Sequence, residues 1–312
     1  MKFILLFAIL AGFFTFSHSQ SLAQDNLLDK KLDRAYGAFQ RGYYLTALEV
    51  ALEKAEENDG AAQALLGMLY SEGFGVPQDE KKAAEWFEIA AANGNKEAMF
   101  ALGLMYAEAQ GVEQDIVRAA SLFEQSAKLG HIAAQYNIGL AYYNGKGVEK
   151  NLDLAFEYFE KSAVAGYAEA YFTLGLLFKS GENINQDLKR AAKLIGTAAQ
   201  YGLVAAQVEY GIMVFRGEGT PQNAQVASVW LQQAADQGSP VAMNRLARLY
   251  ARGLGVEANS KLSAKYHFIA RANGVSDLWL DSYVQTLDNT VQNEAKREAQ
   301  LWFSELAFAE NQ

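Results

Sequence analysis

The chain has 312 residues, of which 51% are hydrophobic and 20% charged, and this balance excludes wholesale disorder because enough apolar surface is present to form a core. Its formal net charge is −9 at pH 7, so the surface repels nucleic acid and anionic lipid unless a local basic patch reverses the field. The sequence contains no cysteine, which excludes disulfides, thiolate metal sites and lipid attachment through cysteine.

Residues 1–23 have the pattern of a secretory signal peptide. Lys2 provides a short basic segment, residues 3–16 form an apolar run, and Ser21-Leu22-Ala23 supplies small residues at the cleavage positions. The run is shorter than the ~20 residues of a membrane-spanning helix, which favours cleavage after Ala23 over a retained anchor. We therefore expect an exported mature chain with a formal charge of −10, periplasmic or secreted and without a transmembrane segment.

A 36-residue period begins at residue 59 and ends at residue 274 in six copies without an insertion. Few prolines and many glycines favour short helices joined by glycine turns, and each copy holds apolar residues at helical spacing in two segments. We call the first segment of each repeat helix A and the second helix B. The clearest column lies in helix A: Leu66-Gly67, Leu102-Gly103, Ile138-Gly139, Leu174-Gly175, Tyr210-Gly211 and Leu246-Ala247.

The segment YYNGKGVEKNLDLAF, residues 142–156, shows the loop between the two helices. A G-x-G before a helix can hold phosphate, but Lys146 has no basic counterpart in the other repeats, so the glycines indicate a joint. The first residue of helix B is preceded in every repeat by a side chain that can cap its free N–H groups. These residues are Asp79, Asp115, Asn151, Asp187, Asn223 and Asn259.

The pattern A-x-x-x-L-G-x-x-Y-x-x-G-x-G-V-x-x-D, followed by K-A-x-x-W-F, resembles the Sel-one-like repeat, a relative of the tetratricopeptide repeat. The resemblance covers residues 59–274 and implies an all-α, right-handed α-α superhelical solenoid of stacked helical hairpins. It also implies a scaffold or adaptor role without a cofactor. Residues 24–58 resemble a tetratricopeptide hairpin and are expected to cap the front, and residues 275–312 are expected to form capping helices at the other end.

Helix A is expected to line the concave surface of such a solenoid, where its columns are apolar and aromatic in the middle repeats. One interpretation is a groove for a protein or peptide partner, and the other is a second core layer between adjacent A helices. The candidate groove residues are Phe100, Leu104, Tyr136, Leu140, Tyr143, Phe172, Leu176 and Phe215.

Four arginines gather by sequence on the last A helices. Arg245, Arg248 and Arg252 share one helical face, and Arg216 precedes them by one repeat, so together they are candidates for binding an anion. The alternative is a solvated basic ridge balanced by nearby acids.

No catalytic, nucleophile or metal motif occurs in the sequence, so an enzyme, a metal site and a cofactor are not expected. His131 is interpreted as a surface residue and His267 as a packing substitution in an end repeat. The favoured function is a non-enzymatic, monomeric scaffold of the bacterial envelope that grips a protein partner. The alternatives are a polysaccharide- or peptidoglycan-associated assembly factor and a purely structural spacer.

Overall fold

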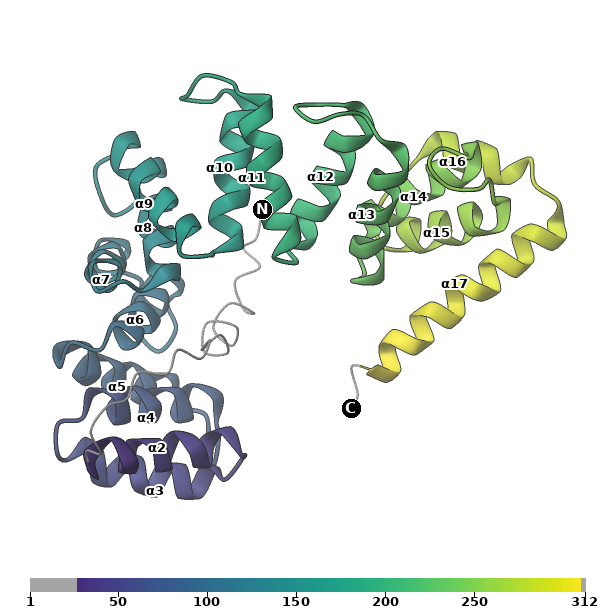
Figure 1. Ribbon diagram of the computed structural model, residues 1–312. Helices are drawn as coiled ribbons and strands as arrows, with labels where there is room; N and C mark the ends of the chain where they lie inside the picture. Colours follow the sequence, from purple (N-terminus) through teal and green to yellow (C-terminus); the bar gives the residue numbers. More distant parts are fainter. Residues whose placement is uncertain (1–26, 310–312) are drawn as a thin grey trace. The chain divides into compact units, whose positions relative to one another are not determined.

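The computed structural model describes residues 27–309, with side chains for residues 34–305; the predicted signal segment, residues 1–23, lies outside them. Every regular element between Leu27 and Ala309 is an α-helix, and successive helices pair into antiparallel hairpins (Figure 1). This confirms the predicted all-α solenoid of stacked hairpins. None of these helices combines the length and apolarity that a membrane crossing requires.

The chain divides into two compact units at the bond between Ala165 and Gly166. In the first unit each helix packs on the next one along the chain, both within a hairpin and between hairpins. Its helices are α2 (Leu27–Gln40), α3 (Tyr44–Ala55), α4 (Gly60–Glu72), α5 (Glu80–Ala92), α6 (Lys96–Glu108), α7 (Ile116–Lys128), α8 (Ile132–Asn144) and α9 (Leu152–Val164).

The second unit continues the same arrangement and ends differently. Its hairpins are formed by α10 (Ala168–Ser180), α11 (Leu188–Gln200), α12 (Val204–Arg216), α13 (Ala224–Asp236), α14 (Pro240–Arg252) and α15 (Ser260–Ala272). Two more helices follow, α16 (Leu278–Gln285) and α17 (Asn289–Ala309), and α17 packs along α15 through buried Ala295 and Ala299.

The loop residues expected to cap helix B do so in all six repeats. Each side-chain oxygen accepts a hydrogen bond from the amide three residues later, at 2.9 to 3.1 Å, as between Asp79 and Lys82. This satisfies one of the N–H groups that a helix start leaves without a partner, so the sequence fixes where each B helix begins.

The glycine column of helix A leaves room for a bulky side chain of helix B. A Cβ atom built on Gly67 would lie 2.6 Å from the ring of Phe87, and one on Gly139 would lie 2.8 Å from Phe159. Phe159 is fully buried and cannot swing away. In the sixth repeat, Ala247 stands in the glycine column of helix A and His267 in the bulky column of helix B, so both residues of the contact differ.

The second loop glycine has a steric role beyond its left-handed backbone. At Gly147 φ is +76°, and an added Cβ would collide with the carbonyl oxygen of Ile116, at the start of helix B in the preceding hairpin. Gly111 meets Glu80 in the same way within the first unit, and Gly255 meets Ala224 within the second. The turn between two helices is therefore also a contact between successive hairpins.

Replacing Gly139 by alanine should lower the free energy of unfolding by about 1–2 kcal/mol, because overpacking against Phe159 outweighs the helix propensity that alanine adds. The matched control is Gly211→Ala, where the nearest atom is Cγ of Leu231 at 3.0 Å and needs to move by only a few tenths of an ångström. Urea unfolding followed by circular dichroism measures both. Equal stability of the Gly139→Ala and wild-type proteins would contradict the steric explanation.

Candidate functional site

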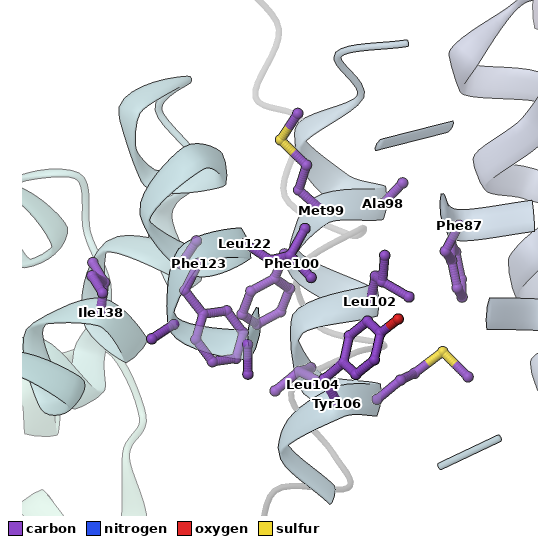
Figure 2. Packing of buried hydrophobic residues seen from close by; sticks show 14 of the residues in the cluster. Phe87, Ala98, Met99, Phe100, Leu102, Leu104, Tyr106, Leu122, Phe123 and Ile138 are labelled. Atoms are coloured by element: carbon purple, nitrogen blue, oxygen red, sulfur yellow. The ribbon is translucent and has the colours of Figure 1, made fainter. Parts of the chain in front are cut away.

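Phe100 and Leu104 of α6 were predicted to lie in a partner-binding groove, but the structure places both in the core, with 7% and 5% of their surface exposed. The Phe100 ring packs on Phe123 of α7, with 5.7 Å between ring centroids (Figure 2). It also stacks at 4.4 Å on the imidazole of His131, which stands at the start of the next A helix. Helix α7 and the start of the next hairpin thus cover Phe100, and Leu104 belongs to the same buried cluster, so both residues lie in the core and not in an open groove.

His131 is not the plain surface residue that the sequence suggested. Its Nδ1 atom accepts a hydrogen bond from the amide of Ala134 at 3.1 Å and caps α8. Burial, assisted by the nearby charge of Lys96, lowers the pKa of His131 to about 4. The imidazole is therefore neutral at pH 7, as a hydrogen-bond acceptor must be at this position.

Tyr136, Leu140 and Tyr143 of α8 are half-buried and share one helical face, so they form a continuous stripe on the first unit, here called the α8 stripe. Tyr136 and Tyr143 both lean on the ring of Phe159, with centroids 5.7 and 6.4 Å away, and the ammonium group of Lys150 lies 5.9 Å from the Tyr143 ring. Their rings are held in place by these contacts and still reach the surface.

In the second unit, three predicted groove residues remain partly exposed to solvent. Leu176 of α10 is 38% exposed. Phe172 of α10 and Phe215 of α12 are half-buried, each against the core cluster of its own hairpin or the next. These side chains resemble the α8 stripe in apolar character and in partial burial.

The four arginines do not converge as free cations. Arg216 pairs with Glu218 at 3.2 Å. Arg248 forms two hydrogen bonds to the carboxylate of Asp277, at 2.6 and 2.7 Å, and its guanidinium group lies 5.3 Å from the Trp279 ring. Two of the four candidate arginines, Arg216 and Arg248, therefore already have carboxylate partners within the chain.

Asp277 is a buried, ion-paired carboxylate that the sequence pattern did not single out. It is 7% exposed, caps α16 through the amide of Leu280, and also accepts a hydrogen bond from Asn244 at 3.0 Å. Burial alone would raise the pKa of Asp277, but the hydrogen bonds from Arg248 and Asn244 outweigh burial and lower it to about 2. The capping position before residues 278–284 was readable from the sequence, whereas the pairing with Arg248 was not.

The two histidines of the described segment belong to different units, and each is held by contacts within its own unit. His267 is 1% exposed, and its Nε2 atom lies 2.9 Å from Asp281, which Arg271 also contacts. No cluster of three or more metal-ligating side chains occurs in the described part of the chain.

Comparison with known proteins identifies the repeat. Six segments match the Sel1 repeat, at residues 60–95, 96–131, 132–167, 168–202, 204–239 and 240–275. The chain is similar to the crystal structure of a Sel1 repeat protein from Oxalobacter formigenes, with 27% identity and a TM-score of 0.70 over 79% of this chain and 99% of that one.

A second solved structure shares the fold. It is c5321, a protective antigen present in uropathogenic Escherichia coli strains, which has 24% identity and a TM-score of 0.57 over 89% of this chain and 68% of that one. No curated protein matches the chain significantly.

Replacing Asp277 by asparagine should keep the cap of α16 but lower the free energy of unfolding by about 1–2 kcal/mol, because the charge that pairs with Arg248 is lost. The folded-state pKa is depressed from 3.8, so this contribution is complete above pH 4 and disappears as the pH falls towards 2. Urea unfolding at pH 7 and pH 3 should therefore show a smaller difference from wild type at the lower pH.

The control for this substitution is Asp187→Asn, which changes a capping carboxylate of α11 that bonds only the Arg190 amide in its cap. It should change stability by less than about 0.5 kcal/mol. A difference that is independent of pH, or one as large in the control, would refute the role assigned to the Arg248–Asp277 pair.

Proposed function

Because the chain belongs to the Sel1 repeat family, whose members generally act as protein-interaction scaffolds and are typically non-catalytic, we propose that it binds a protein partner through exposed faces of its A helices. The observation that carries the proposal is the α8 stripe, where two tyrosines and a leucine remain at the surface after the hairpins have stacked. On α6, the equivalents of Tyr136 and Leu140 in the preceding repeat, Phe100 and Leu104, are closed by packing.

The α8 stripe has the chemistry of a protein-binding surface. Tyrosine combines a large apolar ring with a polar hydroxyl, and such residues carry much of the binding energy at protein interfaces. The contacts of Tyr136 and Tyr143 with Phe159 already restrict both rings, so binding orders them at a smaller entropic cost. The stripe spans seven residues of helix, about 10 Å, which matches two turns of a partner helix or a short extended segment.

The apolar surface of Phe172, Leu176 and Phe215 in the second unit supplies further contact area of the same kind. Helix faces presented in series suit a long partner segment better than a small ligand. This favours a protein partner over a soluble metabolite.

The signal-like pattern of residues 1–23 supports export to the envelope, into the periplasm or beyond it. In this setting the mature chain would act as an adaptor outside the cytoplasm. The polysaccharide alternative rested on four converging arginines, two of which bind acidic residues of the chain.

Replacing Tyr136 and Tyr143 together by alanine should abolish or weaken partner binding at least tenfold, because two restricted aromatic anchors are lost. A photocrosslinking residue at position 143 should trap the partner in cells, and mass spectrometry identifies it. The matched control places the same residue at Val117, which is 67% exposed on α7. Equal crosslinking at both positions, or unchanged affinity of the double variant for the identified partner, would refute the α8 stripe as the binding surface.

Export is tested by the amino terminus of the protein purified from its native host. Peptide sequencing should find a chain that begins at Gln24, in the periplasmic or the secreted fraction. A cytoplasmic protein that retains residues 1–23 would overturn the envelope location and leave the scaffold role intact.

A further inference from the structure

Helix α14 carries three arginines on one side and no acidic residue. Arg245, Arg248 and Arg252 occupy positions i, i+3 and i+7 of the sequence PVAMNRLARLYAR. Only Arg248 has a carboxylate partner, the buried Asp277. The arginines on either side, Arg245 and Arg252, are both exposed.

The acidic residues of the neighbouring A helix and its loop are already engaged. Glu209 of α12 pairs with Lys179, and Glu218 lies 3.4 Å from Lys179 and 3.2 Å from Arg216. Neither Arg245 nor Arg252 forms an ion pair within residues 34–305. The guanidinium groups of Arg245 and Arg252 therefore carry uncompensated positive charge on either side of the Arg248–Asp277 ion pair, on the surface of the second unit.

The second unit also carries less net negative charge than the first. Residues 1–165 contain 14 basic and 22 acidic residues, whereas residues 166–312 contain 13 basic and 14 acidic residues. The chain as a whole is negatively charged and repels acidic partners. A patch with two unpaired arginines attracts such partners locally.

Arg252 is held in an orientation suited to a carboxylate. Its guanidinium group lies 4.4 Å from the centroid of the Trp279 ring, and Trp279 stacks on Tyr283 with ring planes 5° apart. The hydroxyl of Tyr283 lies 3.0 Å from that of Ser260, which ties the stack to α15. Stacking occupies the face of a guanidinium and leaves its edge N–H groups available for a bidentate bond.

We propose that Arg245 and Arg252 form a docking site for an acidic segment of a protein partner. The two residues lie seven positions apart on α14, about 10.5 Å along the helix. An extended chain advances ~3.3 Å per residue, so carboxylates three residues apart match this spacing. A protein segment is favoured over an acidic polysaccharide because the family generally mediates protein interactions, and because Arg252 covers the Trp279 face that a sugar ring would use.

This site lies in the second unit, whereas the α8 stripe belongs to the first. It adds an electrostatic contact of defined chemistry to an otherwise apolar mode of binding. Such contacts act mainly on the association rate and on the choice of partner, and they weaken with salt.

The test uses the mature chain, residues 24–312, and a fluorescein-labelled, amidated nonapeptide of glycine with glutamate at positions 2, 5 and 8. Fluorescence anisotropy at low ionic strength measures its affinity, and a peptide with glutamine at the same positions is the ligand control. The acidic peptide should bind at least tenfold tighter than the glutamine peptide, and the Arg245→Gln/Arg252→Gln variant should lose roughly fivefold to tenfold in affinity.

The matched protein control is Lys189→Gln/Arg216→Gln, which removes the same charge from exposed positions of the same unit. It should bind the acidic peptide like the wild type, and circular dichroism should show equal helix content in all three proteins. Equal affinity of the Arg245→Gln/Arg252→Gln variant and the wild type, or an equal loss in the matched control, would overturn the proposal.

Two further results would show that the site binds something other than an acidic segment of a protein partner. If sedimentation velocity shows self-association of the wild type that the Arg245→Gln/Arg252→Gln variant lacks, the site binds a second copy of this acidic chain. If polygalacturonate at equal carboxylate concentration displaces the peptide more effectively than unlabelled peptide does, the occupant is a polysaccharide.

Discussion

The contact between a glycine of helix A and a bulky side chain of helix B is the constraint on which each hairpin depends. At Gly67, Gly103 and Gly139 the opposing ring occupies the space that a methyl group would take, so the two helices pack closer than larger residues would permit. The ring in turn covers the helix A backbone and excludes water from the core. A substitution on either side disturbs both helices, and the sixth hairpin, with Ala247 opposite the smaller His267, changes both partners.

A second close approach links one hairpin to the next. The loop glycines at positions such as 147 and 255 bring the turn of one hairpin against the first turn of helix B in the hairpin before it. Because backbone meets backbone there, no side-chain rotation can relieve a collision. Stacking order is therefore encoded in the same loops that join the helices, and the 36-residue period, which runs through the six repeats without an insertion, repeats this contact at a constant position.

The sequence predicted the features that all six repeats share, and it did not predict the contacts that occur in only one repeat. The glycine columns, the capping residues and the helix faces follow from periodicity, and they give the hairpins and their boundaries. The burial of Phe100 did not follow, since it depends on His131 reaching back from the next repeat, and histidine occurs in that column only once. The Arg248–Asp277 pair likewise joins residues 29 positions apart across the end of the repeats, where the period no longer applies.

These differences indicate where function can vary without loss of the fold. The columns that touch the next hairpin's backbone or ring are held small or bulky by packing, whereas one helix A column changes from the half-buried Leu140 on α8 to the ion-paired Arg248 on α14. One scaffold can thus present an apolar tyrosine stripe in one unit and a basic, aromatic-supported surface in the other. Each surface can therefore differ from its neighbours in shape and charge while the packing that builds the hairpins stays the same.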